Sequence, residues 1–200
     1  VPASQNVSVT VRVGEVHALV GENGAGKSTL TKVMAGVTPP TGGTVLFEGE
    51  EVRFASPAEA LTRGIAMVFQ ETSLVPSMTV AQNLYLGDES LFNQLRGLYI
   101  SAQQFLQSLN FNVDPWATVS TLGAAQKQMV EIARAVCVEP GGDGTPLIIL
   151  DEPTAVLEQA EVEVLEREIR KLREFASVIF VSHRLDEILR ICDRVFVLRN

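Results

Sequence analysis

The chain has 200 residues, of which 46% are hydrophobic, so it is long and apolar enough to form one large domain around a sizeable core. Its net charge of −8 makes it a poor candidate for sequence-independent nucleic-acid binding, in which Lys and Arg neutralise phosphates. No apolar run approaches the roughly 18 residues of a transmembrane helix, and the two cysteines, Cys137 and Cys192, lack metal-ligand spacing. We therefore expect no zinc site, and buried, reduced thiols as in the cytosol.

The first third of the chain mixes two kinds of strand. Apolar and polar residues alternate over 7–13, which predicts a half-buried strand, and short stretches at 44–47 and 52–54 predict further strands of a small antiparallel sheet. Residues 16–20 instead predict a short, buried strand. Residues 30–35 then carry helical spacing that ends at Gly36.

A complete G-x-x-x-x-G-K-[ST] loop joins this buried strand to this helix. Its members are Gly21, Glu22, Asn23, Gly24, Ala25, Gly26, Lys27, Ser28 and Thr29. Glycines allow the backbone N–H groups to point inward, and these donors and the positive end of the helix favour phosphate oxygens. Lys27 adds charge for the β- and γ-phosphates, and Ser28 offers a hydroxyl to Mg²⁺. The order strand, loop, helix therefore predicts a site for a nucleoside triphosphate.

The middle of the chain is mostly helical. Ser56 and Pro57 begin a short helix with a cap residue and a proline at the first helical position. A buried strand is predicted over 65–69 and ends at Gln70. From residue 74 to residue 139, apolar residues recur at spacings of three and four, most clearly over 80–84, 102–109 and 123–138. This segment predicts a helical insertion in an α/β core.

Two acidic residues, Asp151 and Glu152, follow an apolar stretch at 147–150 that is typical of a central parallel strand. This is the position of a Walker B acid. Asp151 would hold Mg²⁺, a hard ion that keeps several waters, and Glu152 would polarise the water that attacks the γ-phosphate.

The remaining elements continue the α/β alternation. A loop rich in glycine and proline spans 139–146, before the apolar stretch, and an amphipathic helix is predicted over 158–175. A buried strand over 178–181, a helix over 185–192 and a strand over 195–198 complete the chain.

Five separated stretches together resemble the ATP-binding-cassette (ABC) family over essentially all 200 residues. They are 21–29, 68–71, 120–135, 147–154 and 181–184. The resemblance implies an α/β fold with a P-loop NTPase core and a mostly parallel sheet, an N-terminal antiparallel β subdomain and an inserted α-helical subdomain. The core and β subdomain would comprise residues 1–73 and 141–200, and the helical subdomain with its signature would comprise residues 74–140.

The resemblance also implies roles for single residues. Gln70 matches the Q-loop glutamine, which contacts Mg²⁺ and the attacking water and couples the site to a membrane partner. His183 matches the switch histidine that contacts the γ-phosphate. Each alone would be an ordinary polar residue at a strand end. With Lys27, Ser28, Asp151 and Glu152, they complete the machinery of an ATPase that uses ATP and Mg²⁺.

Two positions depart from the family pattern. The usual L-S-G-G-Q signature is here Leu122-Gly123-Ala124-Ala125-Gln126. Gly123 lacks the hydroxyl that would bond the γ-phosphate on a partner domain, and Ala125 adds a methyl where the backbone approaches closely. Glu158 stands where the family's D-loop usually has Asp. We expect the signature face to be impaired.

Within the family, residues 69–84 and 128–135 resemble bacterial sugar-import ATPases of the ribose, galactose, xylose and arabinose type. These proteins carry two cassettes in one chain, and the sequence resembles the first of them. The aromatic residue that stacks on adenine would lie before Val1, so we expect a piece of a longer protein.

That resemblance implies three partners: the second cassette, a membrane permease and, indirectly, a solute-binding protein. It places the chain at the cytoplasmic face of the membrane, with no nucleic-acid partner. Of the two ATP sites of the pair, the one on this domain would hydrolyse strongly and the other weakly. The transported solute stays open.

Two alternatives remain from the sequence. A soluble ABC ATPase that acts on DNA or ribosomes would carry long coiled coils or basic regions, and the chain has neither. A largely non-catalytic, regulatory cassette would explain the altered signature, but Glu152 and His183 argue against it.

Overall fold

A computed structural model describes residues 7–70, 72–86, 95–137 and 144–199. In this part of the chain, five parallel strands form one sheet in the order β4-β5-β6-β1-β7. The strands are β1 (Val16–Gly21), β4 (Ile65–Val68), β5 (Leu147–Asp151), β6 (Ser177–Val181) and β7 (Arg194–Leu198). The expected α/β fold with a parallel sheet is confirmed.

The apolar strand sequences are explained by burial on both faces of the sheet. In β5, Ile148 and Leu150 belong to one core cluster, and Leu147 and Ile149 belong to the other. Successive side chains of a strand point to opposite faces, so a strand that is covered on both sides needs a continuous apolar run. Leu150 pairs with Phe180 in the neighbouring β6, which alternates in the same way.

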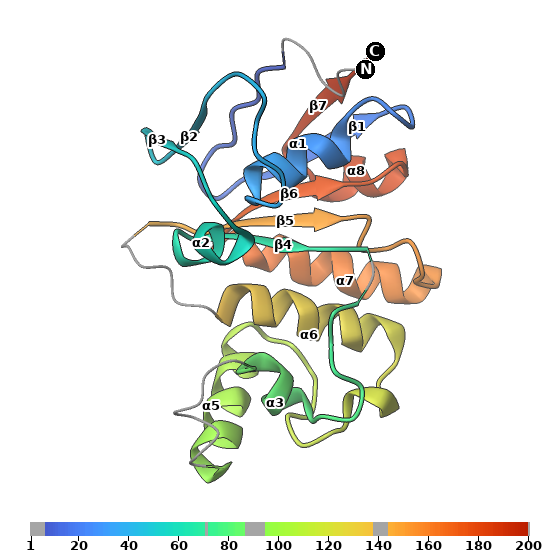
Figure 1. Ribbon diagram of the computed structural model, residues 1–200. Helices are drawn as coiled ribbons and strands as arrows, with labels where there is room; N and C mark the ends of the chain where they lie inside the picture. Colours follow the sequence, from blue (N-terminus) through green and yellow to red (C-terminus); the bar gives the residue numbers. More distant parts are fainter. Residues whose placement is uncertain (1–6, 71, 87–94, 138–143, 200) are drawn as a thin grey trace.

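Helices cover both faces of the sheet (Figure 1). On one side, α1 (Lys27–Met34) and α2 (Pro57–Thr62) pack against β1 and β4. On the other side lie α6 (Ala124–Cys137) and α7 (Gln159–Leu172), with α8 (Leu185–Ile191) against α7. The α2 helix begins as predicted, because the side chain of Ser56 accepts a hydrogen bond from the N–H of Glu59 at 3.3 Å.

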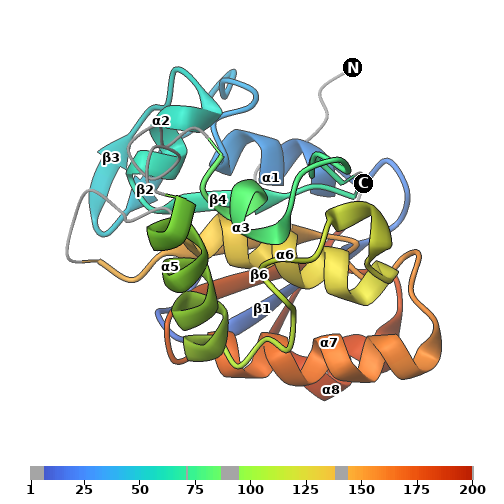
Figure 2. The ribbon, with the colours of Figure 1, turned by 90° about the horizontal axis from the view of Figure 1, so that it is seen from below.

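The helical segment packs onto the sheet through α6. Helix α3 (Val80–Leu84) contacts both α5 (Leu95–Ser108) and α6, and α6 in turn contacts β4 and α7. Figures 1 and 2 place α3 and α5 beyond α6, away from the sheet. A short 3₁₀ turn, Val119–Thr121, precedes α6. The helices predicted over 80–84, 102–109 and 123–138 are confirmed, except that residue 138 lies outside the described residues, as do 139–143 of the predicted loop.

The predicted antiparallel sheet is confirmed in a smaller form. It consists of β2 (Val45–Phe47) and β3 (Glu50–Val52), so the stretch at 52–54 is a strand only at its first residue. The strand predicted over 7–13 is wrong, because residues 7–13 are described and form no strand. Val7, Val9 and Val11 are nevertheless partly buried between exposed polar neighbours. The alternation of apolar and polar residues therefore arises because these valines contact the core. It does not indicate hydrogen bonding to a neighbouring strand.

Both cysteines are partly buried, less deeply than expected. Burial raises the pKa of the Cys192 thiol to about 12, so this thiol is protonated at neutral pH. None of the helices among the described residues is long and apolar enough to cross a membrane.

Candidate nucleotide-binding site

The predicted site residues lie at one edge of the sheet, where β1, β4, β5 and β6 end. The phosphate loop follows β1, and Asp151 is the last residue of β5. His183 lies two residues beyond the end of β6, and Gln70 lies two residues beyond β4. Parallel strands place their carboxyl ends at the same edge, where ligands of such sheets bind. The topology thus brings together residues that are up to 162 positions apart in the chain, from Gly21 to His183.

The phosphate loop has the backbone geometry that its glycines predict. Gly26 has a φ of 91° and begins α1 without a side-chain cap, so the first turn of the helix faces a potential anion. A Cβ on Gly21 would lie 2.6 Å from the carbonyl oxygen of Leu198, because β7 passes close by. Lys27 folds back across the loop, where its Nζ donates to the carbonyl oxygens of Gly21 at 2.7 Å and Glu22 at 3.1 Å.

A cavity of about 230 Å³ opens in front of this loop. The loop residues that line it are Asn23, Gly24, Gly26, Lys27, Ser28 and Thr29, and Asp151, Glu152 and Val181 form the opposite wall. One wall therefore offers backbone N–H groups, a helix N-terminus and a lysine, and the other offers two carboxylates. This arrangement suits phosphate groups together with a divalent cation, which shields the carboxylates from the phosphates.

The pKa of Asp151 shows the electrostatic effect of this acidic wall. Burial raises the pKa of its carboxyl group above the ordinary aspartate value, and the adjacent Glu152 raises that pKa further, against the opposing effects of Lys32 and Lys27. A cation next to Asp151 would relieve this destabilisation of the charged carboxylate. The donors present, a carboxylate and the Ser28 hydroxyl, are hard oxygen ligands that fit Mg²⁺.

No group of three His, Cys, Asp or Glu side chains among the described residues could hold a metal by itself.

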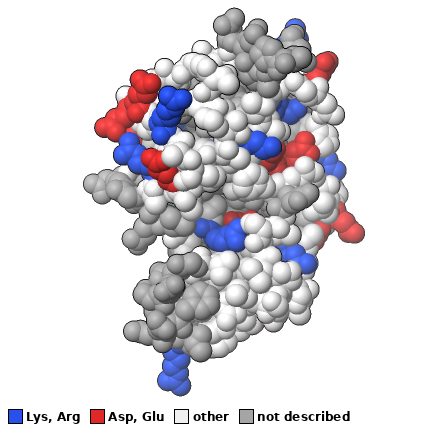
Figure 3. Space-filling view, in the orientation of Figure 1, with Lys and Arg blue, Asp and Glu red and all other residues white. Residues whose placement is uncertain are grey.

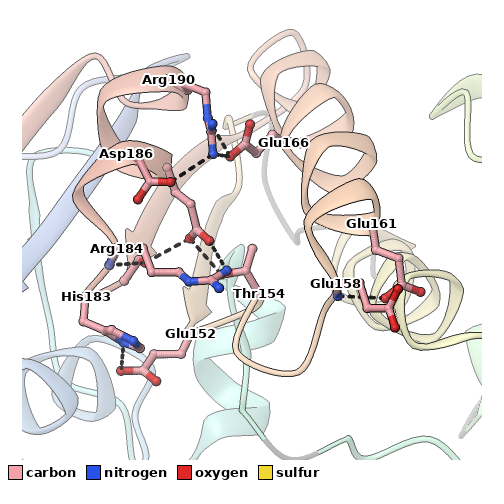
Figure 4. Close-up of polar contacts among 11 residues, drawn as sticks. Glu152, Thr154, Glu158, Glu161, Glu166, His183, Arg184, Asp186 and Arg190 are labelled. Carbon is pink, nitrogen blue, oxygen red and sulfur yellow. Dashed lines mark hydrogen bonds and ion pairs between the residues drawn. The ribbon is translucent and has the colours of Figure 1, made fainter.

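Glu152, on the wall of the cavity, contacts His183 (Figure 4). His183 Nδ1 lies 3.4 Å from Glu152 Oε1, and the histidine side chain is 65% exposed. Glu152 has a φ of 49°, which is uncommon for a residue other than glycine, and its N–H donates to the carbonyl oxygen of Val181 at 3.0 Å. Such a strained backbone conformation is typical of functional turns.

Gln70 and His183 are predicted site residues that do not line the cavity. Gln70 is exposed at the end of β4, and its neighbour Glu71 lies outside the described residues. Thr72 and Ser73, which follow in the chain, are instead held by helix α6. Glu131 of α6 is 4% exposed and accepts hydrogen bonds from the Thr72 hydroxyl at 2.8 Å and the Ser73 N–H at 2.5 Å.

Among the buried acids, two that hold loops of the site, Glu131 and Glu187, were not predicted from the sequence. Glu131 fixes the segment after Gln70 to α6, and Glu187 of α8, 1% exposed, bonds to the loops that carry Glu152 and His183. Each is an acidic residue on the apolar face of its helix. An acid in such a position must find partners, and this was the only signal in the sequence.

The altered signature lies at the start of α6. The N–H of Gly123 donates to Gln126 Oε1 at 3.3 Å, and the N–H of Ala125 donates to Glu161 Oε1 at 3.5 Å. A Cβ on Gly123 would meet only Glu161 Oε1, at 3.8 Å, so the backbone does not require glycine here. The N–H of Glu158 donates to Glu161 Oε2 at 3.1 Å, at the start of α7.

The comparison with family models matches residues 4–155 to the ABC transporter family. The chain belongs to this family. It is 45% identical to the ribose import ATP-binding protein RbsA of Chelativorans sp. (strain BNC1), 43% to the xylose import ATP-binding protein XylG of Geobacillus kaustophilus, and 42% to the galactose/methyl galactoside import ATP-binding protein MglA of Shigella flexneri. Each alignment covers all of this chain but only 39–40% of the relative. The chain thus spans about two fifths of the length of these curated relatives.

Solved ABC cassettes share the fold. A nucleotide-free ATP-binding cassette superposes with a TM-score of 0.82 at 28% identity, and covers 98% of this chain and 81% of that chain. A dimeric cassette in a post-hydrolysis state, bound to ADP and Pi, superposes with a TM-score of 0.76 at 25% identity, over 98% of this chain and 86% of that chain. The P-loop NTPase fold of an ABC cassette is therefore confirmed.

The raised pKa of Asp151 predicts a pH dependence of stability. Between the ordinary aspartate pKa of about 3.9 and the raised value, the folded chain binds more protons than the unfolded chain, so this residue makes stability fall as pH rises through that window. We expect Asp151→Asn to raise the free energy of unfolding at pH 7 without nucleotide or Mg²⁺, and to lose this gain below about pH 4. Urea unfolding at both pH values measures it.

The matched control for this prediction is Asp186→Asn, because the Asp186 side chain is 70% exposed and makes one ion pair, at 3.4 Å, with Arg190. It should give no gain in stability at pH 7. Equal effects of the two substitutions would contradict the account of Asp151.

Proposed function

We propose that this chain is an ATP-binding and ATP-hydrolysing cassette that powers import of a sugar or similar small solute through a membrane permease. The observation that carries the proposal is the cavity between the phosphate loop and the Asp151–Glu152 pair. The identity to sugar-import ATP-binding proteins over the whole chain supports the transport assignment.

The chain's own residues supply the positions that phosphoryl transfer requires. Backbone N–H groups of residues 21–29 and the Lys27 ammonium group would bind the β- and γ-phosphates of ATP. Ser28, Asp151 and Gln70 would hold Mg²⁺, which supplies charge neutralisation at the phosphates. For Gln70 this requires movement toward the cavity, because it does not line the cavity here.

Glu152 would orient and polarise the attacking water, and His183 would hydrogen-bond the γ-phosphate. Their contact of 3.4 Å, with Glu152 on the wall of the cavity, supports a shared task in the chemical step. In such a site, positioning and electrostatic stabilisation provide most of the rate enhancement.

We propose further that the two sites of a paired cassette differ. ATP bound here would be closed by the signature of the partner cassette. The signature that this chain lends in return lacks a hydroxyl at Gly123, and the Glu161 carboxylate already accepts from the helix start at Ala125. A carboxylate at this position competes with a phosphate for the same N–H groups. The likeness to a dimeric cassette supports pairing of this kind.

The proposed partners are a second cassette, an integral membrane permease and, indirectly, a solute-binding protein, with the chain at the cytoplasmic face of the membrane. Residues 74–140 would form the helical subdomain that transmits closure to the permease, and residues 1–73 and 141–200 the core with its β subdomain. Contacts of α3 and α5 that reach the sheet through α6 support this division.

Substitution of Glu152 tests both hydrolysis and asymmetry. In the full-length protein, Glu152→Gln should lower ATP turnover about 100-fold or more, because loss of a general base typically costs 10²–10⁴-fold. ATP affinity should be retained, since the phosphate loop is intact. The control is Glu163→Gln, an equal change of charge at an exposed position of α7. Unchanged turnover would contradict the role of Glu152 in activating the attacking water. A loss of only half of the turnover would contradict the proposed difference between the two ATP sites.

The import assignment is tested by identifying the proteins that co-purify with the full-length protein. We expect the full-length protein to co-purify from detergent-solubilised membranes with a multi-spanning permease. Acidic and basic side chains are interspersed on the face drawn in Figure 3, which gives nucleic acid no basic surface there. Recovery with ribosomes or DNA in place of a permease would contradict the import assignment and favour a soluble ABC ATPase.

A further inference from the structure

Glu187 is a buried carboxylate of α8 that bonds to Thr154, to Ser182 and to Arg184, the N-cap residue of its helix. Its Oε2 accepts from the Thr154 hydroxyl at 2.8 Å and from the Ser182 hydroxyl at 3.0 Å, and its Oε1 accepts from Arg184 Nη1 at 2.7 Å. Thr154 and Ser182 are each 2% exposed. The Ser182 hydroxyl also accepts from the N–H of Arg184, at 3.0 Å. One side chain thus closes a small polar network inside the protein.

This network joins the two loops that carry the proposed chemistry. Thr154 lies two residues after Glu152, and Ser182 and Arg184 flank His183. Figure 4 shows Thr154 and Arg184 next to the contact between Glu152 and His183. A displacement of Glu187 would therefore be felt by both loops.

The two functional side chains depend on their backbones for position. Glu152 keeps a φ of 49° because its turn is anchored, by its own N–H to Val181 and by the N–H of Ala155 to the carbonyl oxygen of Glu152 at 3.1 Å. His183 is 65% exposed, and among the described residues its imidazole contacts one polar group, Glu152 Oε1, so its position depends on the residues on either side.

We propose that Glu187 is a positioning residue that sets the spacing of Glu152 and His183 and thereby the rate of the chemical step. The inference rests on the proposed ATPase function. A first-turn acid also stabilises its helix, but Asp186 provides an exposed acid in the same turn, and burial of Glu187 against two hydroxyls and a guanidinium is not needed for that effect.

The test compares Glu187→Gln with Asp186→Asn in the full-length protein. Both remove one negative charge from the first turn of α8. Glu187→Gln leaves one acceptor oxygen for three donors, so the two loops lose part of their shared anchor. We expect kcat to fall about 10-fold or more with KM for ATP changed less than about 2-fold, since small displacements of reacting groups cost large factors in rate. Asp186→Asn should leave both constants within about 2-fold.

Thr154→Val provides a second, independent variant, because it removes one hydroxyl with little change of shape. It should lower kcat in the same direction. Combined with Glu187→Gln it should lower kcat less than the product of the two single effects, since both act through one network. Multiplicative effects would overturn the proposal.

A structural readout separates this proposal from the ATPase function. In the full-length protein, the imidazole resonance of His183 is assigned by NMR from its loss in His183→Gln, and His183 is the exposed one of the two histidines in these 200 residues. Glu187→Gln should shift and broaden the His183 resonance, and Asp186→Asn should not. An unchanged His183 resonance, or a variant that lowers only the melting temperature at unchanged kcat, would overturn the positioning role. Absence of turnover in the unsubstituted protein would refute the ATPase function but leave the His183 comparison valid.

Discussion

Parallel pairing of β1, β5 and β6 is the constraint on which the site depends. Register fixes Val16 opposite Val178 and Asp151 opposite Val181, so the phosphate loop, the acidic pair and His183 emerge at one height. A slip of one residue would turn every side chain of the slipped strand to the opposite face of the sheet and would exchange the residues that fill the two core clusters. The hydrophobic core therefore fixes the relative positions of the polar groups above it, because both faces of these strands are covered by helices.

The polar groups at this edge show how burial shapes their chemistry. Burial disfavours the charged form of the Asp151 carboxyl group and raises its pKa. The Lys27 ammonium group donates hydrogen bonds to the carbonyl oxygens of Gly21 and Glu22. Both arrangements would change if a phosphate and a divalent cation bound together, since each would then gain an opposite charge. Such a site would favour a charged pair of ligands over either one alone.

The sequence predicted what depends on local pattern. The phosphate loop needs glycine at fixed positions between a strand and a helix, and the continuous apolar run before Asp151 marks a strand covered on both faces. Alternation over 7–13 failed as a strand signal, because periodicity reports which side chains touch the core and does not report whether the backbone has a partner. The contacts of Glu131 and Glu187 could not be predicted from local pattern, because their partners are distant in the chain. Glu131 bonds to Ser73, 58 residues away, and Glu187 bonds to Thr154, 33 residues away.

The central claim is that the cavity binds a nucleoside triphosphate through its phosphates and a shared Mg²⁺. Calorimetric titration of the chain with ATP, ADP and AMP, each with and without Mg²⁺, tests it most directly. The account predicts that affinity rises with the number of phosphates, that Mg²⁺ strengthens ATP binding, and that Lys27→Ala removes most of the difference between ATP and AMP. Equal affinity for AMP and ATP, or no effect of Lys27→Ala, would contradict it.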